Sequence, residues 1–212
     1  MNRFTFLILL IGVYTTACGP SAPEETADAE TVSPQRPWKL VCLGGSSTIG
    51  ENMAPEQAYP AMLADALAQA GQRVKVVNAG IKGETIAGAE ARLSWILQQR
   101  LDAFLFALGE EKADELLSEE QQKQLWQSLC TNLRNAYPEI PVFVLRLGKH
   151  EQAPSWWDEL QESYQLTLLQ PNWQDVFDRT LDDQETWSAE DHAALAQWLA
   201  NQLHDWPTQH YQ

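Results

Sequence analysis

A serine follows the first apolar run of the chain, at the point where a buried strand would turn into a helix. The run at residues 39–43 leads into Gly44 and Gly45, and Ser46 comes directly after them. A hydroxyl at the end of a parallel strand lies at the sheet edge where α/β proteins bind ligands. Such a hydroxyl attacks an acyl carbonyl only when a neighbouring base takes its proton. Because glycine and serine also crowd ordinary turns, this motif alone does not establish catalysis.

Two further polar stretches follow the next two apolar runs. They are VNAGIKGET at residues 77–85 and ALGEE at residues 107–111, and a tyrosine-containing stretch, QAYPAML, occupies residues 57–63. Together with the serine turn, these motifs resemble the arylesterase, thioesterase I and lysophospholipase branch of the SGNH (GDSL-type) hydrolases. The pattern of that branch runs GDSLTxGxG, AYPALL and VxNAGxxGDT. The resemblance covers essentially the whole folded body and implies a scaffold that hydrolyses carboxylic esters.

The resemblance implies roles for three residues of an oxyanion hole. Ser46 takes the nucleophile's place and contributes its backbone N–H, and Gly83 contributes a second N–H. The third donor is an asparagine side chain in the family, but Glu111 stands in its place. Losing one such donor costs about a hundredfold to a thousandfold in turnover. Gly45 also replaces an aspartate, which affects local hydrogen bonding more than chemistry. A simpler interpretation makes Glu111 a solvated loop residue.

The late Asp-x-x-His motif of the family departs from its pattern more seriously. Asp183 takes the aspartate's place, but Thr186 occupies the histidine's place and cannot act as a base. Removing the base from a serine hydrolase costs about a millionfold in turnover. His192 matches a second family histidine that serves packing, and a role as substitute base is the minor alternative. Lys82 and Lys112 could form a serine–lysine dyad, but nothing in their spacing supports one.

Several other kinds of chemistry find no support in the sequence. It contains no metal-ligand pattern and no phosphate-binding glycine loop with its lysine, so no cofactor and no metal are predicted. A formal net charge of −15 repels phosphate backbones, which argues against nucleic acid as a partner. Cys42 and Cys130 lie in apolar or helical patterns and are interpreted as small buried residues. Trp156 and Trp157 either line a groove or pack in the core, and we favour the core.

The elements that must position these residues alternate along the chain, as in parallel strands joined by crossover helices. A three-layer α/β/α sandwich with a five-stranded parallel sheet of flavodoxin-like winding is predicted. Ser188, followed by acidic residues, should cap the last helix. We expect strands at 39–43, 74–78, 103–108, 142–147 and 166–169, and helices at 58–70, 86–99, 119–136, 156–164 and 188–204.

The N-terminal residues indicate export. Residues 1–18 combine Arg3, an apolar run and small residues before Cys18, which predicts a signal peptide with a lipobox cysteine. Residues 19–37 are rich in Pro, Ser and acidic residues and predict a flexible tether to an SGNH-like domain at 38–208. We expect a lipid anchor on Cys18 and an address at the outer membrane facing the periplasm. The alternative is an ordinary secretory signal and a secreted or periplasmic protein.

Three functional interpretations follow. In the first, the domain is a pseudoenzyme that binds an acyl-ester, lipid or glycan ligand, or a partner, at the cell envelope. In the second, it is an active esterase, thioesterase or lysophospholipase that uses Ser46 with an unconventional base. In the third, it is a structural lipoprotein without a functional cleft. The sequence does not name a ligand or an oligomeric state.

Overall fold

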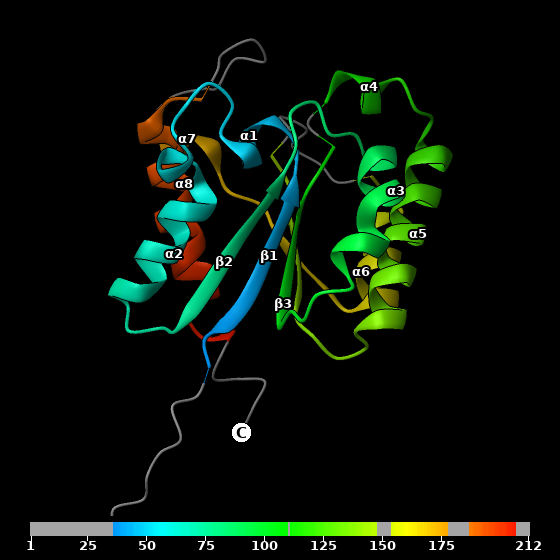
Figure 1. Cartoon of the computed structure of the whole chain (residues 1–212). Coiled ribbons are helices and arrows are strands. Elements are labelled where there is room, and N and C mark those ends of the chain that lie inside the picture. The colour runs from blue at the N-terminus through cyan, green and yellow to red at the C-terminus, as the bar shows by residue number, and fades with distance from the viewer. Residues whose placement is uncertain (1–35, 110, 148–153, 178–186, 207–212) are drawn as a thin grey trace, which may run out of the picture. The chain divides into compact units, whose positions relative to one another are not determined.

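The computed structural model describes residues 36–109, 111–147, 154–177 and 187–206 (Figure 1). The expected signal peptide, its Cys18 and nearly all of the expected tether therefore lie outside the described residues. Arg36–Gln212 forms a compact unit of its own. This unit contains the complete sheet and both hydrophobic cores, so it has what an independently folding domain requires.

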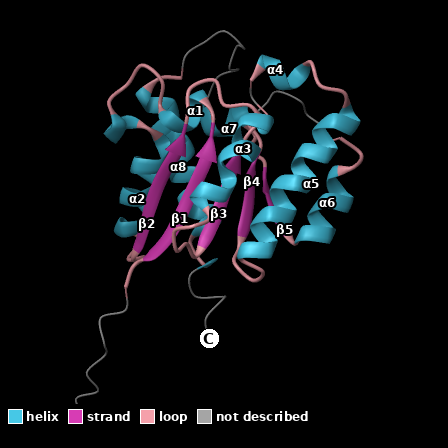
Figure 2. Cartoon of the chain, turned by 45° about the vertical axis from the view of Figure 1, so that its right-hand side comes forward, coloured by secondary structure: helices cyan, strands magenta, loops and turns pink. Residues whose placement is uncertain are grey.

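A five-stranded parallel sheet forms the centre of the domain, in the order β2-β1-β3-β4-β5 (Figure 2). This is the flavodoxin-like winding that the sequence predicted. Short runs rich in Val, Leu and Phe suit strands that are covered on both faces. The strands are β1 Trp38–Gly44, β2 Val74–Gly80, β3 Ala103–Ala107, β4 Val142–Leu145 and β5 Leu166–Leu169.

The long helices agree with the predicted ones to within a few residues, but the short ones were not predicted. Ser188 caps the last helix as expected, because its side chain accepts from the Asp191 N–H. Elements of three to five residues are too short to show a hydrophobic period. The long helices are α2 Tyr59–Gln69, α3 Ile86–Ile96, α5 Glu119–Ala136, α6 Trp157–Tyr164 and α8 Ala189–Leu203. The short ones are α1 Ser46–Ile49, the 3-10 helix η1 Pro55–Gln57, α4 Lys112–Glu115 and α7 Trp173–Phe177.

Helices cover the two faces of the sheet as separate layers (Figure 1). α2 and α8 pack over one face, and α3, α5 and α6 pack over the other. Cys42 lies in the core under α2 and α8, and Cys130 lies in the core under α3, α5 and α6. Both thiols are free and buried. Burial raises the pKa of both thiols, as expected for inert packing residues. Trp156 and Trp157 are also buried, stacked at 5.2 Å between ring centroids, which confirms the preferred core interpretation.

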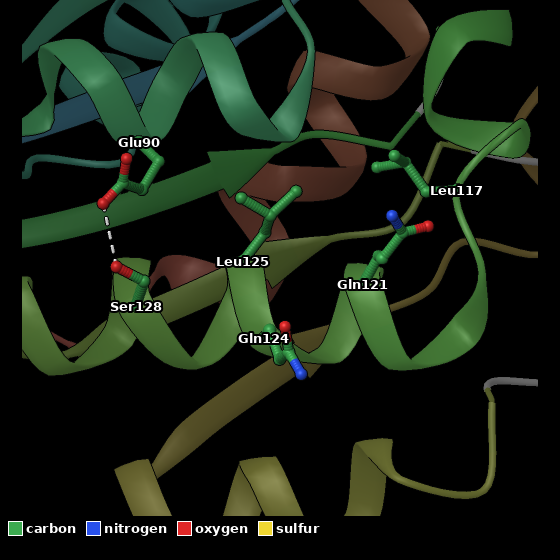
Figure 3. A pocket seen from close by; sticks show the side chains of 6 residues that line it. All are labelled: Glu90, Leu117, Gln121, Gln124, Leu125 and Ser128. Atoms are coloured by element: carbon green, nitrogen blue, oxygen red, sulfur yellow. Dashed lines mark hydrogen bonds between the residues drawn. The ribbon is translucent and has the colours of Figure 1, made fainter.

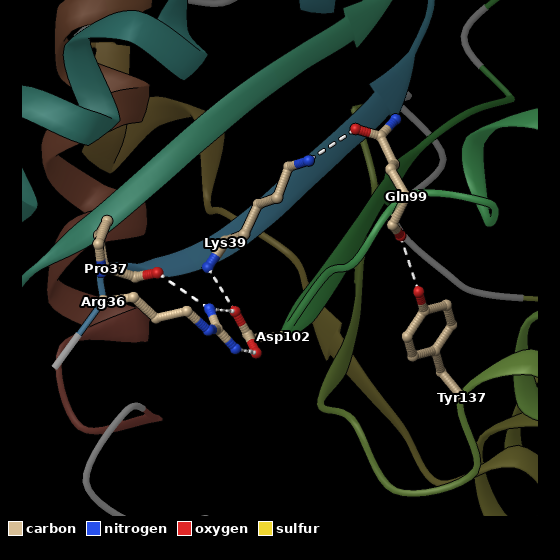
Figure 4. Close-up of polar contacts among 6 residues, drawn as sticks. All are labelled: Arg36, Pro37, Lys39, Gln99, Asp102 and Tyr137. Carbon is tan, nitrogen blue, oxygen red and sulfur yellow. Dashed lines mark hydrogen bonds and ion pairs between the residues drawn. The ribbon is translucent and has the colours of Figure 1, made fainter.

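A buried carboxylate joins the amino ends of two strands (Figure 4). Asp102 accepts two hydrogen bonds from the Arg36 guanidinium, at 2.7 and 2.5 Å, and a third from the Lys39 backbone N–H at 2.8 Å. Burial alone would raise the pKa of Asp102, but these bonds and the Arg36 charge bring it below its usual value. The first described residue of the domain is thus fastened to the loop before β3.

Candidate active site

The turn that carries Ser46 is set by close packing at the carboxyl end of β1. A Cβ added at Gly44 would lie 2.1 Å from Thr48 Oγ1 and 2.5 Å from the Ala107 carbonyl oxygen. Only glycine therefore allows α1 to begin so near β3. The Asn78 side-chain amide donates to the Thr48 carbonyl oxygen at 2.8 Å, which fastens α1 to the neighbouring β2. Ser46, the first residue of α1, is half-buried at the edge where ligands bind in such sheets.

Gly83 lies beside the serine hydroxyl. Its backbone N–H donates a hydrogen bond to Ser46 Oγ at 3.1 Å. Gly83 has a φ of 68°, in the left-handed region that favours glycine. The structure therefore brings together the two residues to which the resemblance assigns backbone donors.

Glu111 also reaches the serine. The Ser46 hydroxyl donates to Glu111 Oε1 at 3.0 Å. Glu111 is the N-cap residue of α4 and is half-buried, so the simpler interpretation of a solvated loop residue does not describe it. A carboxylate oxygen thus accepts a hydrogen bond from the serine hydroxyl, at a position where the resemblance implies an asparagine that offers an N–H to an oxyanion.

Asp114 anchors the short helix that presents Glu111. Its side chain is buried, and its two carboxylate oxygens accept from the Ile86 backbone N–H at 3.0 and 3.3 Å. Burial raises the pKa of Asp114, the bond from Ile86 opposes this, and the charges of Glu111 and Glu84 raise it further. α4 is thereby docked on the start of α3, which fixes the backbone from which Glu111 extends.

An ion pair between Lys82 and Glu51 stands next to the serine. Lys82 Nζ lies 2.5 Å from Glu51 Oε1. The hydrogen bond from Lys82 holds the pKa of Glu51 below its usual value, and the Ser46 hydroxyl contributes in the same direction. Glu51 gave no signal in the sequence, because nothing in the spacing of residues 51 and 82 predicts their contact. Since Glu51 binds the Lys82 ammonium, Lys82 is held as a cation, unlike the neutral lysine of a serine–lysine dyad.

A second ion pair fastens the loop that carries Gly83. Arg92 of α3 donates to the buried Glu84 carboxylate and, at 2.7 Å, to the Ala79 carbonyl oxygen at the end of β2. The loop between β2 and α3 is thus held at both of its ends. This support keeps the Gly83 N–H directed at Ser46.

His192 serves packing, as the resemblance implies. It is buried, its ring stacks on Tyr59 with 6.2 Å between centroids, and its Nδ1 accepts the Tyr59 backbone N–H at 3.0 Å. Burial lowers the pKa of His192 to about 4, so the ring is neutral at physiological pH. His204 pairs with the adjacent Asp205 at the exposed end of α8. Both histidines in the described part of the chain are therefore engaged elsewhere than at Ser46.

The two late motif positions, Asp183 and Thr186, lie outside the described residues, as do His150 and His210. Lys112 is exposed on α4. Within the described ranges, no group of His, Cys, Asp and Glu side chains is arranged to hold a metal ion. In the same ranges, no helix is both long and apolar enough to cross a membrane.

A separate groove of about 360 Å³ lies between α3 and α5 (Figure 3). Ser128 donates to Glu90 across it at 2.8 Å. The groove is lined by Glu90, Leu117, Gln121, Gln124, Leu125 and Ser128. None of these residues belongs to the Ser46 site.

A serine at the carboxyl edge of a flavodoxin-like sheet, with a glycine N–H on its oxygen, defines an esterase-type α/β/α scaffold. The profile of the GDSL-like Lipase/Acylhydrolase family matches residues 42–205. The chain belongs to this family. An arylesterase from Vibrio mimicus is 42% identical over 72 residues, which cover 34% of this chain and 36% of that protein. The chain thus matches about a third of the length of this relative.

Solved structures of the family have the same fold. The SGNH-hydrolase family esterase AlinE4 superposes with a TM-score of 0.60 at 21% identity, covering 81% of this chain and 97% of that one. The psychrotrophic esterase EstA from a Pseudoalteromonas species superposes with a TM-score of 0.62 at 16% identity, covering 81% of this chain and 97% of that one. TesA superposes with a TM-score of 0.61 at 21% identity, covering 80% of this chain and 97% of that one. These likenesses establish the SGNH hydrolase fold.

Proposed function

We propose that this protein is a cell-envelope lipoprotein whose SGNH-type domain binds a ligand or partner without hydrolysing it. The observation that carries the proposal is the hydrogen bond from Ser46 Oγ to Glu111 Oε1 at 3.0 Å. It supports the proposal because Glu111 stands at the position to which the resemblance assigns a hydrogen-bond donor, and a carboxylate only accepts. The ligand classes that suit the scaffold are acyl esters, lipids and glycans.

Electrostatics oppose ester hydrolysis at this site. Attack on an ester places a negative charge on the carbonyl oxygen, within a few ångströms of the serine. A carboxylate at that distance repels the oxyanion by on the order of 4 kcal/mol at an effective dielectric of about 20, and by less where water screens it. Glu111 therefore raises the barrier of the step that an asparagine would lower.

The second support is the lack of an assigned base. Thr186 stands at the position that the resemblance gives to the catalytic histidine, and a threonine hydroxyl does not take a proton from serine. His192, the next histidine along the chain, uses Nδ1 to accept from the Tyr59 N–H. Its lowered pKa, about 4, also makes it a weak base.

The envelope location rests on the sequence. The apolar run before Cys18 and the small residues next to that cysteine are typical of a lipoprotein signal. Lipidation of Cys18 would hold the domain at the outer membrane on the acidic segment that follows. Metabolic labelling with a fatty-acid analogue, compared with a Cys18→Ser variant, tests this part of the proposal.

One contact favours a second function, an active esterase with a serine–glutamate pair. In that reaction Glu111 takes the Ser46 proton while Oγ bonds to the acyl carbon, and it returns the proton to the leaving alkoxide. Water then releases the acyl group by the same proton transfers. Once protonated, Glu111 is neutral and can donate to the oxyanion, which would remove the repulsion described above.

Hydrolysis of p-nitrophenyl acetate by residues 36–212 distinguishes the two functions. A ligand-binding protein should show no turnover above that of the Ser46→Ala variant. Turnover that disappears in both Ser46→Ala and Glu111→Gln would contradict the first function and establish the serine–glutamate pair.

A further inference from the structure

The charges around Ser46 indicate which head group a ligand would carry. We infer that the ligand is an amphiphile with a cationic head that donates hydrogen bonds, such as a primary alkylammonium. This inference rests on the proposed binding function of the site. In this inference Glu111 binds the head group and selects it against anionic ligands. The acyl esters, lipids and glycans proposed above include molecules with cationic heads and molecules with anionic heads. The inference therefore restricts the proposed ligands to the cationic ones.

Glu111 differs from Glu51 and Glu84 in its partner. Glu51 is paired with Lys82, and Glu84 is paired with Arg92. The Glu111 carboxylate is instead hydrogen-bonded to the neutral Ser46 hydroxyl. Among the described residues, this charge is in contact with a hydroxyl dipole, and an incoming cation would meet a carboxylate that pairs with neither Lys82 nor Arg92.

Hydrogen-bonding capacity leads to the same ligand class. A primary ammonium has three donors and no acceptor. Glu111 and Ser46 together offer oxygen acceptors to such a group at a separation of 3.0 Å. An anionic head has acceptors only, so it could use the Gly83 N–H but would lie beside the Glu111 carboxylate.

Two exposed isoleucines belong to the two turns that carry Ser46 and Gly83. The exposed fractions are 39% for Ile49 and 46% for Ile81. Ile49 ends the helix that Ser46 begins, and Ile81 precedes Lys82 and Gly83. Their turns are in contact, since a Cβ added at Gly80 would lie 2.4 Å from the Ile49 nitrogen. An alkyl chain on this surface would remove the apolar area of both side chains from water.

Calorimetric titration of residues 36–212 with octylammonium, octanoate and octan-1-ol tests the inference, because the three share one chain length. Octylammonium should bind with one site per protein and about fivefold to tenfold more tightly than octanoate. Glu111→Gln should remove that preference. Glu115→Gln is the matched control, because it removes the same charge from an exposed position of the same helix.

The possible outcomes separate this inference from the function on which it rests. Octanoate binding as tightly as octylammonium overturns the ligand class and leaves the binding function standing. An equal loss in Glu111→Gln and Glu115→Gln also overturns it, because overall charge would then explain the preference. If none of the three compounds binds, and an acyl-ester analogue binds instead, the cationic class is wrong. If no amphiphile of any head group binds, the proposed function fails as well.

Discussion

The Tyr59 backbone N–H donates to His192 Nδ1 at 3.0 Å and thereby joins the start of α2 to the start of α8. The two residues are far apart in the sequence, and the bond holds two helices of one layer together. It also requires a neutral ring with a free lone pair at Nδ1. This requirement makes the stability of the domain depend on pH.

Acidification should destabilise the domain through His192. The pKa of a histidine is near 6.5 in an unfolded chain but about 4 for His192 in the folded protein. Because the unfolded chain binds the proton first, this contribution is complete above about pH 6.5 and is lost as the pH falls toward 4. We expect a loss of about 2 to 3 kcal/mol in the free energy of unfolding over that range.

Urea unfolding at pH 7 and at pH 4.5 measures this loss. His192→Asn keeps an acceptor for the Tyr59 N–H but does not titrate, so its two curves should differ less than those of the unchanged protein. His204→Asn is the control, since His204 is exposed and pairs only locally with Asp205. A pH dependence that His192→Asn leaves intact would show that other groups cause it.

The Asp102 contacts should stabilise the start of the domain. Asp102→Asn removes a buried carboxylate that accepts from Arg36 and from the Lys39 N–H, and hydrogen bonds to charged groups contribute about 1.5 to 3 kcal/mol each. Because the Arg36 side chain is 41% exposed, water screens part of this interaction. We therefore expect the free energy of unfolding to fall by about 2 kcal/mol in total. Asp65 is exposed on α2, so Asp65→Asn is the control and should unfold at the same urea concentration as the unchanged protein. Equal urea midpoints for both variants would disprove the role of Asp102.

The pH dependence of this stabilisation follows from the direction of the Asp102 shift. Its pKa is lowered in the folded protein, so the contribution is present above the ordinary value of about 3.9 and disappears as the pH falls through the folded value. The difference in stability between the unchanged protein and Asp102→Asn should therefore be constant near neutrality. It should shrink only below about pH 4, which distinguishes it from the His192 effect.

Gly44→Ala should prevent the serine turn from forming in its present geometry. The new methyl group would lie 2.1 Å from Thr48 Oγ1, and overpacking of this kind costs about 1 to 3 kcal/mol or more. Gly71→Ala offers a comparison, because Gly71 has a φ of 80° and nothing within 4 Å of an added Cβ. That variant should lose only about 1 kcal/mol, from backbone strain. Thermal unfolding of both variants decides whether Gly44 is more sensitive.

Restoring the family's residues should restore its reaction. The double variant Glu111→Asn with Thr186→His places an amide donor beside Ser46 and an imidazole at the position that the resemblance assigns to the family's base. We expect hydrolysis of p-nitrophenyl acetate at least about a hundredfold above that of the unchanged protein, from the oxyanion donor alone. The activity should vanish when Ser46→Ala is added. Failure to gain activity in a folded double variant would mean that further residues of the site have diverged.

The elements of the fold and the places of Ser46 and Gly83 within it were accessible from the sequence. Apolar runs such as residues 103–107 and the amphipathic pattern of residues 119–136 are local signals, and each was found where it was predicted. The turn at Ser46 and the loop at Gly83 could be located because their motifs are contiguous. Short elements such as α4 escaped prediction, since four residues show no period.

The partners of the side chains were decided only by the tertiary structure. Ser46 and Glu111 lie 65 positions apart, and Tyr59 and His192 lie 133 positions apart, so no local pattern could pair them. Whether Glu111 faced water or the serine depended on how Asp114 docks α4 on α3. A residue's type sets which bonds it can form, whereas the packing of distant elements determines which of those bonds exist.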